Sequence, residues 1–218
     1  KYDPVADFEA IGMVAASPTV MVINSAIPAK NVKELVQLIK AKPDAYSYAT
    51  AGTGTAPHLT GELFNLSTGL NVVNVPYKGS APALTDLIGG QVQYCFETMT
   101  SATPHVKSGK LIALGTTGAT RAKLLPDVPT IEEAGNLKGY EMSIVYAVWA
   151  PTGVPAPIVS KLTKALEQVV ASSAFKEKVA SDGGEVMNLS TPAESNAYFQ
   201  KEMQRLSKIV RDGNIKAD

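Results

Sequence analysis

A glycine-rich turn with hydroxyl side chains, Gly52-Thr53-Gly54-Thr55, is the stretch of this sequence best suited to binding a ligand. It follows a short apolar strand pattern and precedes a helix pattern with Pro57 in its first turn, so we expect Thr55 to cap that helix. The free N–H groups and the positive dipole end of a helix start favour a carboxylate or a phosphate. Such turns also serve backbone geometry alone, and this stretch by itself leaves both interpretations open.

The nucleotide-binding versions of such a turn fit poorly. A P-loop needs Lys-Ser or Lys-Thr after its last glycine, and a dinucleotide turn needs a third glycine in the helix. Neither follows Gly54. The turn therefore favours a small anion over a nucleotide.

Two further strand ends carry polar residues. The segment 71–75 predicts a strand that leads into Lys78-Gly79-Ser80, and we expect Ser80 to cap a second short helix. The segment 91–97 alternates apolar and polar residues and ends in Glu97-Thr98, which could contact a ligand or lie in a solvated turn. Ligands collect at the carboxyl ends of strands in open α/β sheets, so the repeated pattern strengthens the prediction of a site.

Composition excludes several classes of function. The 218 residues include 20 basic and 20 acidic side chains, so bulk charge does not favour nucleic acid or a membrane surface. Cys95 is the single cysteine, which excludes an intrachain disulfide and a cysteine-based zinc site. No apolar run approaches a membrane span, and the chain as given does not begin with a signal peptide.

The rest of the sequence predicts an α/β protein in which the pattern of strands and helices changes near the proline-rich segment 150–157. Before it, we expect separate strands at 8–16 and 19–24, helices capped by Asn31 and Thr130, and strands at 110–115 and 140–149. After it, we expect three amphipathic helices and one short strand, 185–189, with Thr191 capping the last helix. These helices need a sheet that this part of the sequence does not supply.

An ordered set of motifs, which covers essentially the whole chain, resembles the Bug family, the TctC-like solute receptors of bacterial tripartite tricarboxylate transporters. The motifs are Tyr2-Asp3-Pro4, Gly52-Thr53-Gly54-Thr55 with His58, Val75-Pro76-Tyr77-Lys78-Gly79, Asp86-Leu87 with Gly90, Leu125-Pro126-Asp127-Val128-Pro129-Thr130, and Ala150-Pro151 with Gly153 and Pro155. The resemblance implies a type II periplasmic-binding-protein fold, with two α/β lobes around a cleft. One lobe would be 19–143, and the other would combine 1–18 with 144–218.

The sequence also departs from that family. Members normally carry a signal peptide and a first βαβ portion ahead of the Tyr2-Asp3-Pro4 motif, so we expect one lobe to be incomplete at its N-terminal part. The chain would then be truncated, cleaved, or a shortened variant whose exposed sheet edges pair in a homodimer. Val145 and Ala147 stand where the family often has Trp and Gly, which changes one expected wall of the site.

The resemblance implies a set of ligand-binding residues, and no catalytic residue, metal or cofactor. His58 is expected to make hydrogen bonds at the helix start rather than to act as a base, and Lys78 is either a solvated charge or a ligand contact. Tyr146, Ser17 and Thr19 would lie near the crossing strands. The full set is Thr53, Gly54, Thr55, His58, Lys78, Gly79, Ser80, Ala81, Glu97, Thr98, Ser17, Thr19 and Tyr146.

The function implied is that of a periplasmic solute receptor without enzymatic activity. It would capture a dicarboxylate, tricarboxylate, acidic amino acid or aromatic acid and deliver it to membrane permease subunits. Two alternatives are an interaction module that binds no ligand and a serine hydrolase. The hydrolase is disfavoured because no Gly-x-Ser-x-Gly elbow is present.

Overall fold

The computed structural model describes residues 2–187 and 191–216, and it divides into two compact units. Unit 1 consists of Lys1–Ser17 and Ile144–Ser207, and unit 2 consists of Pro18–Ser143 and Lys208–Asp218. The predicted lobes differ from these units at Pro18 and at the end of the chain, because Pro18 and residues 208–218 group with unit 2. That the two units act as the lobes of a clamp stays a prediction.

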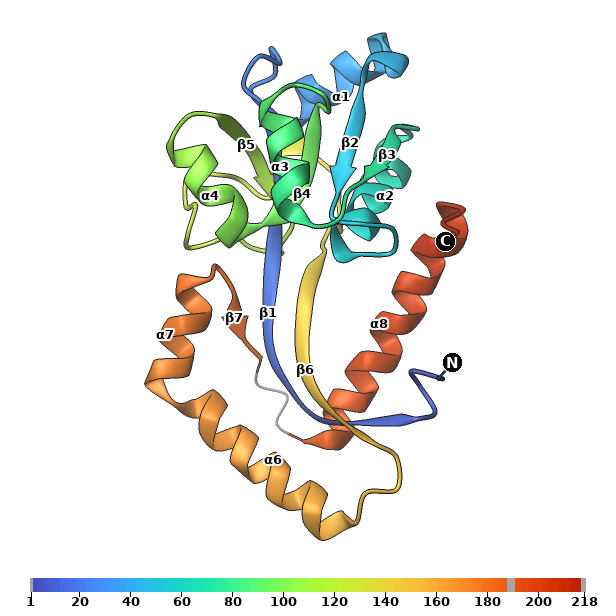
Figure 1. The fold of residues 1–218 in the computed structure, drawn as a ribbon, viewed down its shortest axis with the longest axis vertical. Coiled ribbons are helices and arrows are strands. Elements are labelled where there is room, and N and C mark those ends of the chain that lie inside the picture. Colours follow the sequence, from blue (N-terminus) through green and yellow to red (C-terminus); the bar gives the residue numbers. More distant parts are fainter. Residues whose placement is uncertain (1, 188–190, 217–218) are drawn as a thin grey trace. The chain divides into compact units, whose positions relative to one another are not determined.

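Unit 2 is built on a mixed sheet whose strand order is β3-β2-β4-β1-β5 (Figure 1). β2 (Ser47–Thr50) runs parallel to both β3 (Val73–Pro76) and β4 (Tyr94–Thr98). β1 (Phe8–Asn24) enters with its second half and pairs antiparallel with β4 and with β5 (Leu111–Thr116). β2, β3, β4 and β5 therefore all end at the edge of the sheet where this half of β1 begins.

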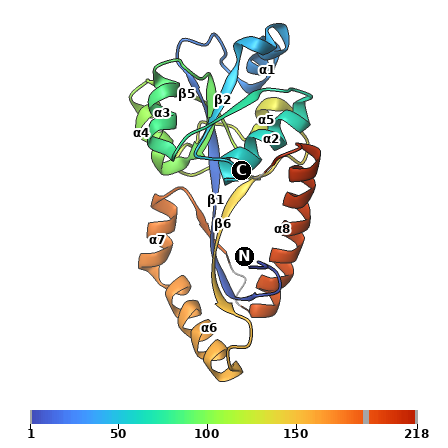
Figure 2. The ribbon, with the colours of Figure 1, turned by 45° about the vertical axis from the view of Figure 1, so that its right-hand side comes forward.

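Helices lie on both faces of this sheet (Figures 1 and 2). An apolar core of buried side chains fills the space on each face. One core receives α1 (Val32–Ala41), α2 (Ala56–Thr68) and α5 (Ile131–Gly135). The other core receives α3 (Ser80–Ile88) and α4 (Met99–Lys107). Strand residues alternate between them: Tyr94 and Phe96 pack in the first, and Cys95 packs in the second. The alternation read in the sequence of this strand thus reflects two buried faces.

Unit 1 combines the first half of β1 with β6 (Ser143–Pro151), apart from its first residue, and with the short β7 (Glu185–Val186). Both strands pair with β1. Its helices are α6 (Ala156–Ala171), α7 (Ser173–Ser181) and most of α8 (Pro192–Asp212). Ile158, Leu162 and Val169 on α6 are between 44% and 51% exposed. The apolar face of α6 is therefore incompletely covered, as the predicted shortage of sheet implies. The predicted end of β7 falls on residues 188–190, outside the described part of the chain.

The prediction of two separate strands at 8–16 and 19–24 was wrong, because β1 is continuous. Its pairing with β7 ends at Ala16 and its pairing with β4 begins at Thr19. Pro18 lies between these two ladders, so its missing N–H interrupts neither of them. None of the helices in the described part of the chain has the length and the apolar character that a membrane span needs.

Helix caps form as the sequence predicts wherever an acidic residue lies three positions after the cap residue. The backbone N–H of Glu34 donates to the Asn31 side chain at 2.9 Å, and Thr130 with Glu133 forms a complete capping box. The N–H of Glu194 likewise donates to the Thr191 hydroxyl at 3.2 Å. These predicted helix starts are confirmed.

Candidate functional site

Three helices of unit 2 begin at one edge of its sheet. β2, β3 and β4 are parallel, and each is followed directly by a helix: α2, α3 and α4 respectively. Because parallel strands end together, the N-termini of these three helices gather at that edge. Each N-terminus presents backbone N–H groups that no carbonyl within the helix can accept. The chain therefore concentrates hydrogen-bond donors and partial positive charge there.

The turn between β2 and α2 depends on two glycines. Gly52 has φ of 133° and Gly54 has φ of 74°, values that side chains with a Cβ rarely adopt. Thr55 occupies the N-cap position, but its hydroxyl donates to the Gly52 carbonyl at 2.7 Å instead of accepting from the helix. The prediction that Thr55 caps α2 with its side chain was wrong, because this bond closes the turn.

Part of this turn remains available to a ligand. The N–H groups of Thr53 and Ala56 donate to no other described residue, and the half-buried Thr53 side chain makes no hydrogen bond among them. These groups are the donors that the turn can offer to an anion.

The start of α3 also differs in detail from the prediction. Gly79, with φ of 106°, holds the N-cap position, and Ser80 is the first helical residue without a side-chain cap. The expected Ser80 cap was therefore wrong: only glycine suits this backbone, and it leaves the N–H groups of Ser80 and Ala81 without partners among the described residues. Lys78 is exposed, and no ion pair with a described residue holds it.

Tyr77 beside this turn belongs to the packing of unit 2. Its N–H donates to the Thr50 carbonyl at 2.9 Å, and its hydroxyl donates to Asp86 at 2.8 Å. Partial burial and the bond to Asp86 raise the pKa of Tyr77 to about 12. The tyrosine thereby links the β2 end to α3 and remains a neutral donor.

Glu97 and Thr98 are engaged in starting α4. Glu97 is only 2% exposed, and its carboxylate accepts the N–H of Thr98 at 2.7 Å. The Thr98 hydroxyl accepts from the N–H of Ser101 at 3.4 Å, as an N-cap residue does. Both residues reach the sheet edge, and both already have partners there.

Thr19 is buried at the same edge and pairs with a residue that the sequence did not single out. Its backbone N–H donates to the Thr117 hydroxyl at 2.8 Å, and the two hydroxyls lie 3.1 Å apart. Thr117 in turn donates to the Met142 carbonyl at 2.5 Å. The signal available in the sequence was the pair Thr116-Thr117 at the end of a predicted strand, the same polar strand end that drew attention to Glu97-Thr98.

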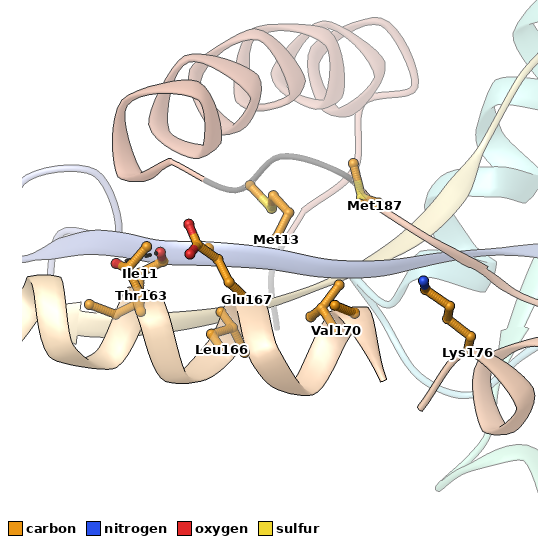
Figure 3. A pocket seen from close by; sticks show the side chains of 10 residues that line it. Ile11, Met13, Thr163, Leu166, Glu167, Val170, Lys176 and Met187 are labelled. Carbon is orange, nitrogen blue, oxygen red and sulfur yellow. Dashed lines mark hydrogen bonds between the residues drawn. The ribbon is translucent and has the colours of Figure 1, made fainter. Parts of the chain in front are cut away.

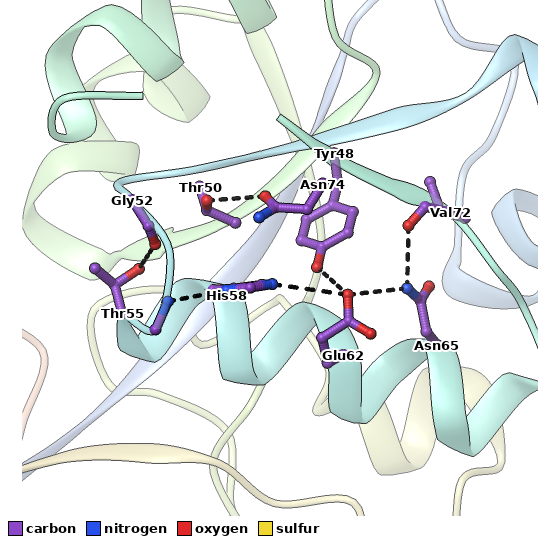
Figure 4. A network of polar contacts seen from close by, with 10 residues as sticks. Tyr48, Thr50, Gly52, Thr55, His58, Glu62, Asn65, Val72 and Asn74 are labelled. Carbon is purple, nitrogen blue, oxygen red and sulfur yellow. Dashed lines mark hydrogen bonds and ion pairs between the residues drawn. The ribbon is translucent and has the colours of Figure 1, made fainter. Parts of the chain in front are cut away.

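His58 connects the glycine turn to the interior of unit 2 (Figure 4). Its Nδ1 accepts the N–H of Gly54 at 3.0 Å, and its Nε2 lies 3.9 Å from a Glu62 carboxylate oxygen. The same oxygen accepts the Tyr48 hydroxyl at 2.5 Å. Burial, followed by this hydrogen bond, raises the pKa of Tyr48 well above its ordinary value. The prediction that His58 makes hydrogen bonds at the helix start is confirmed.

Two of the predicted site residues belong to unit 1. Ser17 is half-buried at its boundary, and Tyr146 on β6 is 49% exposed. Neither lines the hollow of about 360 Å³ that unit 1 carries between β1 and the helices α6 and α7 (Figure 3). Apolar side chains such as Met13, Leu166 and Val170 line most of this hollow. Its polar lining residues are Thr163, Glu167 and Lys176, and among the described residues it has no group of helix N-termini like the one at the edge of unit 2.

Comparison with known proteins places this geometry in a family. Residues 1–215 match the tripartite tricarboxylate transporter family receptor, TctC. The chain belongs to this family. TctC relatives include BugT of Bordetella pertussis, 33% identical over 215 residues, and an Agrobacterium vitis UPF0065 protein from the ttuE-ttuC' intergenic region, 35% identical over 213 residues. These matches cover 97% to 99% of this chain but 61% to 65% of those relatives, so the chain spans less than two thirds of their length.

Solved TctC structures share the fold. The periplasmic binding protein BugD superposes with a TM-score of 0.87 at 35% identity, over 100% of this chain and 73% of its own. An R. palustris protein with adipate gives 0.87 at 31% identity, over 98% and 71% of the two chains. MatC from Rhodopseudomonas palustris with bound malate gives 0.84 at 28% identity, over 96% and 71%. The predicted periplasmic-binding-protein α/β fold is confirmed, and the family is one of transport receptors rather than of enzymes.

Proposed function

We propose that this TctC chain is part of a periplasmic receptor that captures a small organic acid and delivers it to the permease subunits of a tripartite transporter. The observation that supports this proposal most directly is the sheet edge of unit 2, where α2, α3 and α4 begin side by side. A helix start binds a carboxylate through backbone N–H groups and the helix dipole, without a full countercharge. Two relatives that were solved with adipate and malate support a dicarboxylate in particular.

The acid would meet donors from two turns. The Thr53 hydroxyl and the N–H groups of Thr53 and Ala56 serve the first turn, and the N–H groups of Ser80 and Ala81 serve the second. Gly54, Thr55, His58 and Gly79 would shape these turns, and Lys78, Glu97, Thr98 and Thr19 would border them. Contacts of Ser17 and Tyr146 with the acid remain part of the proposal. Selectivity would come from the distance between carboxylates, because each helix start accepts one of them.

A thermal-melt screen of this chain tests the proposal. The panel should hold adipate, malate, a tricarboxylate, glutamate and an aromatic acid. An acid present at a hundred times its Kd adds about 2.7 kcal/mol to the free energy of unfolding, which raises the midpoint by about 5 to 10 °C. If a folded sample shows no shift with any acid, this chain does not bind as proposed.

Two threonine variants then locate the site. Thr53→Val removes a hydroxyl that no described residue engages, and it should weaken binding about five- to thirtyfold without changing stability. Thr68→Val is the matched control, because Thr68 is the last residue of α2 and lies at the opposite end from the turn. Equal affinities of both variants and the parent protein would remove the glycine turn from the site.

One observation favours a second candidate function, an interaction module. The exposed apolar face of α6 and the hollow beside it could bind a protein partner or a second copy of the chain. Sedimentation of the purified chain, with and without the acid that shifts its melt, separates the two candidates. Association without any ligand response favours the module, and a ligand response from a monomer favours the receptor.

A further inference from the structure

The polar network behind the glycine turn suggests how that turn keeps its shape. The Gly52–Thr55 turn contains two residues with positive φ, and Gly54 is exposed, with nothing within 4 Å of the position that a Cβ would take. Two of its hydrogen bonds, from the Thr55 hydroxyl and the Thr55 N–H to the Gly52 carbonyl, lie within the turn itself. They fix its curvature but do not tie it to the sheet. The bond from Gly54 to His58 joins the turn to a buried side chain.

We propose that His58 is a positioning residue, which holds the glycine turn in the form that receives a carboxylate and does so without contacting the acid. The expected effect of His58 on acid binding rests on the proposed function. The geometric part of the inference, that His58 fixes the turn through the Gly54 N–H, stands by itself. The Gly54 N–H is occupied by His58 and is not a donor for the acid.

The two nitrogens of the imidazole face different groups, the Gly54 N–H and the Glu62 carboxylate. Accepting the Gly54 N–H requires a bare Nδ1, so the neutral ring carries its hydrogen on Nε2. Nε2 lies 3.9 Å from the Glu62 Oε1 atom. The same oxygen accepts hydrogen bonds from the Tyr48 hydroxyl at 2.5 Å and from the Asn65 amide at 3.5 Å. Asn65 donates further to the Val72 carbonyl at 3.2 Å. Glu62, which faces Nε2, is thus bonded to Tyr48 on β2 and to Asn65, which reaches the segment before β3.

Burial supports this role. His58 is 7% exposed, and Tyr48 behind the network is fully buried between α2 and the sheet. A side chain so enclosed can fix the height and tilt of the exposed turn in front of it. A shift of the turn would move the Thr53 and Ala56 donors, so binding should depend on His58 through geometry.

Two conservative substitutions separate the two ring nitrogens. In His58→Asn the side-chain oxygen takes the place of Nδ1 and can still accept from Gly54. In His58→Gln the amide reaches the position of Nε2 and loses the Gly54 contact. The protein has two histidines, so His105→Gln on α4 is the matched control. A role limited to filling space would rank the variants by size, with Gln nearer to His than Asn.

Hydrogen exchange of the Gly54 amide, followed by NMR in the ligand-free protein, is the first readout. We expect exchange in His58→Gln to accelerate at least about tenfold, with His58→Asn and His105→Gln close to the parent protein, since one hydrogen bond is lost only in the first. Adipate affinity should follow the same order, with about tenfold weakening in His58→Gln alone. Equal exchange in the Asn and Gln variants, or faster exchange in Asn, would overturn the inference.

A second measurement needs no variant. The ¹⁵N shifts of the His58 ring should report hydrogen on Nε2 and none on Nδ1 at neutral pH, and the opposite tautomer would overturn the inference. If the parent protein binds no acid but the exchange difference between the Asn and Gln variants persists, the positioning role of His58 stands and the proposed function fails.

Discussion

Replacing Ala81 by Glu should change folding and binding in opposite directions. Ala81 is the exposed second residue of α3, a helix without an acid in its first turn. A carboxylate at this position interacts favourably with the helix dipole and should stabilise the protein by about 0.3 to 1 kcal/mol. For a chain of this size, that raises the unfolding midpoint by about 1 to 3 °C. Judged by folding alone, the variant is an improvement.

The same carboxylate should repel the acid that α3 receives. Two unit charges about 7 Å apart repel by about 0.6 kcal/mol in water and by about 2.4 kcal/mol at the effective dielectric constant of a protein surface. Affinity for a dicarboxylate such as adipate should therefore fall between about threefold and about fiftyfold. Both effects should shrink as salt is raised, because the charges are exposed to screening.

Ala81→Gln is the matched control, since it adds a side chain of the same length without the charge. Calorimetric titration and thermal melts of the three proteins, at low and at high salt, complete the assay. The electrostatic account requires weak binding only in the Glu variant. If the Glu and Gln variants bind adipate with equal affinity, α3 does not receive a carboxylate at its N-terminus. The same conclusion follows if the loss of affinity is as large at high salt as at low salt.

Three further predictions concern stability, measured by chemical or thermal unfolding. Gly61→Ala places a Cβ 2.3 Å from the Tyr48 ring, so it should cost about 1 to 3 kcal/mol, and a gain of up to about 1 kcal/mol from helix propensity alone would contradict this. Thr130→Ala breaks the capping box of α5 and should lower the free energy of unfolding by about 0.5 to 2 kcal/mol. Thr130→Ser keeps the capping hydroxyl and should retain most of that stability. Burial raises the pKa of Tyr48, Tyr94 and Tyr140 in the folded protein, so above about pH 10 only the unfolded chain loses these protons. Stability should then fall by about 1.4 kcal/mol per pH unit for each such tyrosine, and a flat profile from pH 8 to 11 would refute their burial.

Much of unit 2 was predictable because its signals are local. Asn31 with Glu34, and Thr130 with Glu133, predict helix starts since a cap and its acid lie within one turn of each other. The two failed caps, Thr55 and Ser80, lack such an acid partner. Before α2 the Thr55 hydroxyl bonds to the carbonyl of Gly52, which has a positive φ. Before α3 Gly79, also with a positive φ, takes the N-cap position, and Ser80 is the first helical residue. A hydroxyl beside glycines therefore predicts a turn better than a cap.

Contacts between distant segments were not predictable in the same way. Thr117 bonds to Thr19 across 98 positions, and Tyr48 reaches Glu62 only because α2 packs back onto β2. The continuity of β1 was missed because a proline inside a strand normally interrupts pairing. Here one ladder of β1 ends at Ala16 and the next begins at Thr19, so neither needs a hydrogen bond from the Pro18 nitrogen. Which strands pair with each half of β1 is a property of the tertiary structure.

The sequence by itself determined the α/β class, the family, most element starts and the glycine turns, since each depends on residue types within a few positions of one another. The tertiary structure decided which strand ends share an edge, and therefore that α2, α3 and α4 begin together. It also decided that His58 faces Gly54 on one side and Glu62 on the other. Parallel pairing and core packing join residues far apart in the chain, and their energies depend on the whole arrangement rather than on any local pattern.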